Sequence, residues 1–182
     1  NKFVMWNDIH SNPDKIMDND IIASFVDGKL RINNGTESTD ARELDKKKKP
    51  EDYTLPVDVD SSQLEAVIDS GEGKSFILYG PPGTGKSQTI TNMIANALYK
   101  GRRVLFVAEK MAALSVVQSR LEKIGLAPFC LELHSNKATK THFLEQMDEA
   151  MNISHSNSLE EYKRISDELF EKRQTLIRYI EA

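Results

Sequence analysis

Residues 80–87 have the types and the spacing of a site that binds phosphate. They read GPPGTGKS and match the pattern G-x-x-x-x-G-K-S/T. Glycines allow such a loop to curl until successive backbone N–H groups face one anion, and a helix that begins at Lys86 adds the positive end of its dipole. The pattern therefore predicts a nucleotide phosphate site, in which Lys86 contacts the β- and γ-phosphates and the Ser87 hydroxyl ligates Mg²⁺.

The segments on either side of this loop must position it. Three short apolar runs have the composition of buried strands, and the segments that follow them have apolar residues at helical spacing. The predicted strands are Ser75–Tyr79, Arg103–Ala108 and Phe129–Leu133, and the predicted helices are Lys86–Lys100, Met111–Ile124 and Thr139–Met151. Apolar strands that alternate with amphipathic helices predict an α/β fold with a parallel sheet.

The predicted organisation has three parts. Residues 1–58 form an N-terminal flanking segment with a short helix or two, and within it residues 33–52 have almost no apolar content and predict a mobile loop. Residues 59–155 form the part with the phosphate loop, which starts with a helix whose capping-box spacing is that of Ser62 and Glu65. Residues 156–182 predict a charged helical extension or the start of a helical hairpin.

The composition limits the class of protein. The chain has 182 residues, a formal net charge of −4 and 39% hydrophobic residues, which suffices for a packed core. It has no run of about 18 apolar residues, so we expect no membrane partner. The single cysteine, Cys130, excludes an internal disulfide and fits a reducing compartment, so we expect a cytoplasmic location. Residues 74–150 carry ten basic and six acidic side chains, which favours a surface that faces nucleic acid.

The stretch GPPGTGKSQTI, which starts at Gly80, resembles motif I of the superfamily I DNA and RNA helicases. Two flanking stretches agree, because DSSQLEAVI resembles the Q-motif segment of that superfamily and VLFVAEKMAAL resembles motif Ia. With KFVMW near its start, the chain is similar to large bacterial helicase-related proteins that carry a further domain before the helicase core. The resemblance implies an incomplete P-loop NTPase (RecA-like) lobe, with a parallel sheet, flanking helices and a C-terminal helical extension, that uses ATP to act on nucleic acid.

The resemblance also implies roles for individual residues. Gln63 is expected to read adenine, because an amide can donate and accept at once; the alternative is a polar surface residue on a short helix. The residues expected to bind ATP and Mg²⁺ are Gln63, Gly80, Pro81, Pro82, Gly83, Thr84, Gly85, Lys86, Ser87 and Gln88. Residues after the predicted strands are expected to contact the nucleic acid backbone, with an ordinary solvated surface as the alternative. These residues are Lys110, Ser135, Lys137 and Lys140.

Hydrolysis in the helicase family needs an Asp-Glu pair at the end of a buried strand and an arginine from a second RecA-like lobe. The pair Asp148-Glu149 lies among apolar residues at helical spacing, so we assign it to a helix and expect hydrolysis to depend on the remainder of the polypeptide. Two alternatives stay open, an AAA+-type ATPase and a nucleotide-binding scaffold module that does not hydrolyse. DNA and RNA both fit as substrate, and an unpaired apolar strand edge predicts self-association of this chain.

Overall fold

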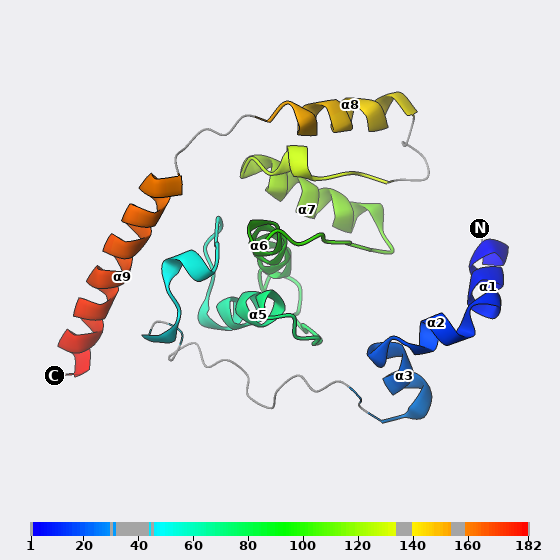
Figure 1. The fold of residues 1–182 in the computed structure, drawn as a ribbon, viewed down its shortest axis with the longest axis horizontal. Coiled ribbons are helices and arrows are strands. Elements are labelled where there is room, and N and C mark those ends of the chain that lie inside the picture. The colour runs from blue at the N-terminus through cyan, green and yellow to red at the C-terminus, as the bar shows by residue number, and fades with distance from the viewer. Residues whose placement is uncertain are drawn as a thin grey trace. The chain divides into compact units, whose positions relative to one another are not determined.

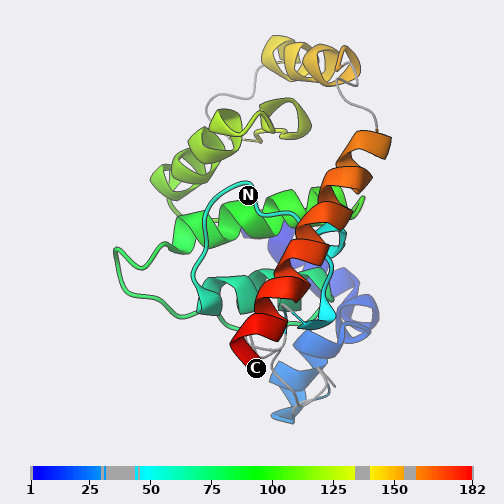
Figure 2. The ribbon, with the colours of Figure 1, turned by 90° about the vertical axis from the view of Figure 1, so that its left-hand side faces the viewer.

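The computed structural model describes residues 2–29, 31, 44, 46–133, 140–153 and 159–181. The chain divides into two compact units, each treated by itself below. One unit is Asn1–Ser38 with Lys74–Phe76, and the other is Thr39–Gly73 with Ile77–Ala182. Figures 1 and 2 show the helices of both units from two directions.

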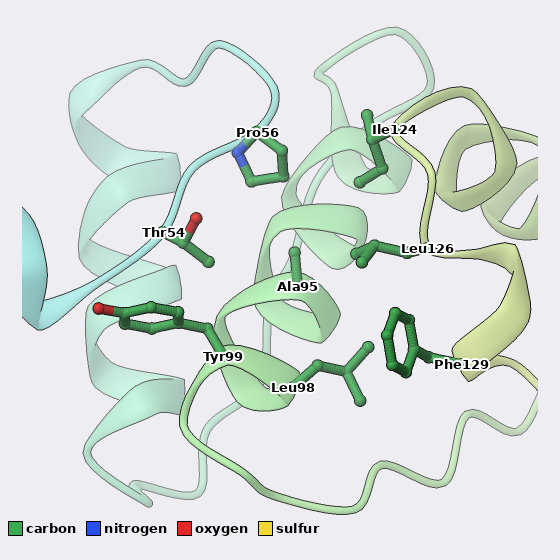
Figure 3. A pocket seen from close by; sticks show the side chains of 8 residues that line it. All are labelled: Thr54, Pro56, Ala95, Leu98, Tyr99, Ile124, Leu126 and Phe129. Carbon is green, nitrogen blue, oxygen red and sulfur yellow. The ribbon is translucent and has the colours of Figure 1, made fainter. Parts of the chain in front are cut away.

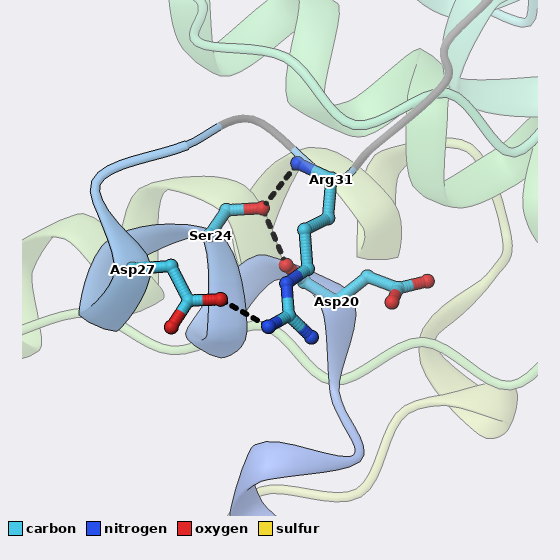
Figure 4. A network of polar contacts seen from close by, with 4 residues as sticks. All are labelled: Asp20, Ser24, Asp27 and Arg31. Carbon is cyan, nitrogen blue, oxygen red and sulfur yellow. Dashed lines mark hydrogen bonds and ion pairs between the residues drawn. The ribbon is translucent and has the colours of Figure 1, made fainter.

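The first unit contains three short helices, in the segment for which the sequence predicts one or two: α1 (Lys2–Ser11), α2 (Pro13–Met17) and α3 (Asp20–Asp27). Figure 4 shows how the chain after α3 folds back onto that helix. The Ser24 hydroxyl donates to the Asp20 carbonyl at 2.6 Å and accepts from the Arg31 backbone N–H at 2.8 Å. The Arg31 guanidinium also pairs with the Asp27 carboxylate, so two side chains of α3, those of Ser24 and Asp27, hold this return.

The second unit contains the phosphate loop and is built around one helix, α6 (Lys86–Tyr99). This helix packs against both α5 and α7 (Figure 1). The remaining elements are α5 (Ser61–Gly71), α7 (Met111–Lys123), α8 (Lys140–Met151), α9 (Leu159–Glu181) and the 3₁₀ turns η1 (Pro50–Asp52) and η2 (Ala127–Phe129). The predicted helices at 86–100 and 111–124 are confirmed to within one residue at their ends.

Two small apolar clusters stabilise the second unit. Ile94 of α6 packs with Val117 and Leu121 of α7, as the helical spacing of these residues predicts. The other cluster joins Ile68 of α5 to Tyr53 and Leu44, and Leu44 is only 1% exposed. Leu44 belongs to the predicted loop 33–52, of which residues 33–43 and 45 lie outside the described residues. The carboxyl-terminal end of that predicted loop is therefore packed.

The predicted parallel sheet of a RecA-like lobe is wrong for this structure. In the parts of the chain that are described, the segments 75–79 and 103–108 are neither helix nor strand, and Phe129 ends the turn η2 instead of starting a strand. Their side chains are correspondingly open to solvent, with Ile77 94% and Leu105 87% exposed. An apolar run gives a segment its strand preference, but a sheet forms only when partner strands satisfy its N–H and C=O groups.

Candidate nucleotide site

The loop from Gly80 to Gly85 runs directly into the first turn of α6. Gly85 is the N-cap residue of this helix, with φ +77°, and Gly83 has φ +88°. This left-handed backbone region disfavours residues with a β-carbon. A β-carbon on Gly85 would also lie 2.5 Å from Nε2 of Gln63, closer than atoms can approach. The two glycines therefore shape the loop, as its sequence predicts.

Lys86 and Thr84 close the loop on itself. The Lys86 ammonium group donates a hydrogen bond to the Gly80 carbonyl, which joins the first residue of α6 to the first residue of the loop. The Thr84 hydroxyl donates to the Pro81 carbonyl at 2.8 Å. Ser87 follows in the first turn of α6, where backbone N–H groups have no acceptor within the helix. The loop thus gathers one ammonium group, one hydroxyl group and helix N–H donors, a set that suits a phosphate with a bound Mg²⁺.

Gln63 lies against this loop, held there by the cap of α5. The cap residue is Asp60, so the predicted capping box of Ser62 and Glu65 is displaced by two residues. The Asp60 carboxylate accepts from the Gln63 backbone N–H at 2.8 Å, and Gln63 Oε1 accepts from the Asp60 N–H at 3.3 Å. Gln63 Nε2 donates to the Thr84 carbonyl at 3.2 Å. The Gln63 and Ser62 hydrogen bonds lower the pKa of Asp60, which keeps this cap ionised.

A row of polar side chains on α6 holds the segment that leads into α5. Asn92 Nδ2 donates to the Val57 carbonyl at 2.8 Å, and Asn92 Oδ1 accepts from the Val57 N–H at 3.1 Å. Asn96 Oδ1 accepts from the Thr54 N–H at 3.2 Å. Both asparagines are 0% exposed. The prediction missed them, although asparagine twice at i, i+4 inside a helix is a signal, because this residue disfavours helix interiors unless its amide has partners.

Gln88 belongs to the same row and does not face the loop. Its amide donates to the carbonyl of Asp58, the residue that follows Val57 in the chain. Tyr99 ends the row, where its hydroxyl donates to the Glu51 carbonyl at 2.8 Å. Tyr99 is 46% exposed, and its partial desolvation, followed by a hydrogen bond with Tyr162, raises the pKa of its hydroxyl to about 12. Of the predicted ATP-binding residues, the structure therefore gathers Gln63, Thr84 and Lys86 at the loop, and engages Gln88 elsewhere.

The residues predicted to contact nucleic acid are only partly described. Lys110 is the N-cap residue of α7 and is exposed, and Lys140 is the first residue of α8 and is also exposed. Ser135 and Lys137 lie outside the described residues. Asp148 and Glu149 lie inside α8, which confirms their assignment to a helix.

An apolar pocket of about 360 Å³ lies at the other end of α6 (Figure 3). Its lining residues are Thr54, Pro56, Ala95, Leu98, Tyr99, Ile124, Leu126 and Phe129. No residue of the phosphate loop contributes to it, so this pocket is separate from the candidate nucleotide site.

Two other kinds of site were sought in the described ranges. They contain no group of three or more His, Cys, Asp or Glu side chains arranged to hold a metal ion. None of the helices described is both long enough and apolar enough to cross a membrane.

The pKa of Cys130 is raised by burial, which makes its thiol a poor nucleophile.

A glycine loop that ends at a helix N-terminus, with its lysine and serine in the first turn, has the sequence and backbone features of a P-loop. The chain belongs to the AAA domain family, whose sequence profile matches residues 58–181. It is 56% identical over 46 residues to the uncharacterized ATP-dependent helicase MG140 of Mycoplasma genitalium, and 48% identical over 63 residues to the MG140 homolog of Mycoplasma pneumoniae. The predicted resemblance to helicase-like ATPases is confirmed.

These matches cover only a minor part of this chain and of the two relatives. They cover 25% and 35% of this chain, and only 4% and 6% of the two relatives. The chain therefore spans a small fraction of the length of the curated relatives that it matches. No solved structure gave a significant match.

Proposed function

We propose that this chain is the ATP·Mg-binding part of a helicase-like ATPase that acts on nucleic acid. The observation that carries the proposal is the loop at residues 80–87, closed at the N-terminus of α6 with Lys86 and Ser87 in the first turn. The match to the AAA domain family fits either kind of ATPase, and the names of both relatives as ATP-dependent helicases favour the helicase-like function. A cytoplasmic location stays a prediction.

The residues present fit this nucleotide. The Lys86 ammonium group would hold the β- and γ-phosphates, the Ser87 hydroxyl would ligate Mg²⁺, and the bound metal would neutralise phosphate charge. The positions of Gly83 and Gly85 leave the loop free of β-carbons at its two left-handed residues, so a phosphate can approach the backbone. Gln63 lies against the same loop. Its amide uses one N–H on the Thr84 carbonyl and one lone pair on the Asp60 N–H, which leaves its second N–H and second lone pair for a base edge.

The test is isothermal titration calorimetry of the 182-residue chain with Mg·ATP. Charge-assisted contacts are worth about 1.5–3 kcal/mol, so Lys86→Ala should weaken binding about ten- to hundredfold. Lys123→Ala is the matched control, because it removes the same charge from the exposed end of α7 and should bind ATP as the wild type does. Equal affinity of Lys86→Ala and wild type would refute the phosphate site.

Nucleic acid binding is tested separately, by fluorescence anisotropy with single-stranded DNA and single-stranded RNA. If Lys110 and Lys140 contact phosphates, Lys110→Ala and Lys140→Ala should each weaken binding to any sequence and flatten the dependence of log affinity on log salt by about 0.7. Unchanged salt dependence in both variants would show that these lysines are ordinary solvated surface residues that do not contact phosphates.

A further inference from the structure

The buried asparagines of α6 bind backbone and not side chains. Asn92 pairs with both the N–H and the C=O of one residue, Val57, as a neighbouring strand would. Asn96, one turn later, accepts from Thr54 at 3.2 Å and lies 3.5 Å from the Val67 carbonyl of α5. The segment 54–58 therefore has its path along α6 specified by amide groups.

These hydrogen bonds determine register as well as stability. Apolar contacts tolerate a slip of the segment along the helix, but a slip would leave the buried Asn92 amide and the half-buried Val57 backbone groups without these hydrogen bonds. An unsatisfied buried polar group costs more than its hydrogen bond gains, so one alignment is favoured over its neighbours.

The aligned segment leads directly to Gln63. Val57 precedes the cap residue Asp60 by three positions, and Asp60 holds both the backbone and the side chain of Gln63. Gln63 in turn contacts the Thr84 carbonyl of the phosphate loop. Because the loop itself begins α6, the distance from Gln63 to the loop depends on how the segment before α5 is held against α6.

The far end of α5 is held by the same helix and the residues after it. The Lys100 ammonium group donates to the Gly71 carbonyl at 3.3 Å, and the Arg102 guanidinium donates to the Ser70 carbonyl at 3.4 Å. With α5 fixed at its carboxyl end, the Asn92 pair controls the amino-terminal end, where Gln63 lies.

We infer that Asn92 is a positioning residue for base selectivity, because it sets where the Gln63 amide lies relative to the phosphate loop. The inference rests on the proposed nucleotide site and adds a residue that contacts neither phosphate nor base. Removal of the Asn92 amide should lower the preference for ATP over GTP and leave the affinity for the phosphates unchanged.

The experiment measures binding of ATP, GTP and inorganic tripolyphosphate, each with Mg²⁺, by calorimetry on the 182-residue chain. Asn92→Ala and the similarly branched Asn92→Leu should each narrow the ATP:GTP affinity ratio about three- to tenfold, the value of a lost hydrogen bond. Tripolyphosphate affinity should stay within about twofold, since the loop is untouched. Asn92→Leu keeps the branched shape of the side chain and introduces no buried charge, so it serves if Asn92→Ala does not fold.

Thr91→Val is the matched control. Thr91 is the neighbouring residue on α6, is also 0% exposed, and uses its hydroxyl only on the Ser87 carbonyl of its own helix at 2.7 Å. It should therefore leave the ATP:GTP ratio as in the wild type. Hydrogen exchange gives a second readout, because the Val57 amide should lose protection in the Asn92 variants and keep it in Thr91→Val.

The outcomes separate the two proposals. An unchanged ATP:GTP ratio in a folded Asn92→Leu or Asn92→Ala protein, or an equal loss of affinity for all three ligands, overturns the positioning role and leaves the phosphate site standing. A wild-type chain that binds tripolyphosphate but does not distinguish ATP from GTP has the same consequence. A wild-type chain that binds none of the three refutes the proposed function, and the positioning role with it.

Discussion

Replacement of Gly85 by alanine tests whether Gln63 lies against the phosphate loop. The new β-carbon would be 2.5 Å from Gln63 Nε2 and would have to displace that amide from the Thr84 carbonyl. The displaced hydrogen bond is worth about 0.5–1.5 kcal/mol. Alanine at φ +77° adds strain of about 1–2 kcal/mol, partly offset by the lower entropy of the unfolded chain.

A double-mutant cycle isolates the contact from the strain. Gly85→Ala should lower the free energy of unfolding in urea by about 0.5–1.5 kcal/mol more in the wild type than in Gln63→Ala, where no amide has to move. Gly83→Ala is the control, because Gly83 also has positive φ but a β-carbon there meets nothing within 4 Å. Gly83→Ala should lower the free energy of unfolding by the same amount in the wild type and in Gln63→Ala. A coupling of zero between Gly85 and Gln63 would refute the contact.

Three further predictions concern other parts of the chain. The pKa of Tyr99 is raised to about 12 in the folded chain, against about 10 for a free phenol. The neutral hydroxyl therefore contributes stability that is fully present below pH 10 and is lost as the pH rises through 12. The difference in unfolding free energy between wild type and Tyr99→Phe should therefore shrink over that range, and a constant difference would contradict it. Phosphate release from ATP should stay near background in the isolated chain, and turnover abolished by Glu149→Gln would overturn the helical assignment of that residue. The exposed Ile77 and Leu105 should cause self-association, which light scattering should show to decrease in Ile77→Lys and Leu105→Lys proteins.

Features that depend on neighbouring residues could be predicted from the sequence. The loop GPPGTGKS, its left-handed glycines and the start of α6 at Lys86 follow from backbone sterics within a few residues. The ends of α6 and α7 followed from apolar spacing and from the glycines at 101 and 125 that stop each helix. The family resemblance came from the same short stretches.

The segment 75–79 shows where this reasoning failed. An apolar run such as SFILY indicates a strand, but strand pairing depends on segments far away in the chain, and in the described residues this run is not assigned as a strand. The segment therefore has the composition of a strand, but it does not form part of a sheet in the described residues.

Tertiary structure alone determined which polar residues of α6 hydrogen-bond to other segments of the chain. The spacing of Asn92 and Asn96 inside a predicted helix signals that their amides have partners, but it does not identify these partners, which are backbone groups 35 and 42 residues away. Gln63 was expected to be a reader of the base, but only the fold brings its amide to the Thr84 carbonyl, 21 residues further along the chain. The sequence by itself determined the phosphate loop, because its geometry is local; the framework that orients Gln63 toward it depends on contacts between distant residues, which exist only once the chain has folded.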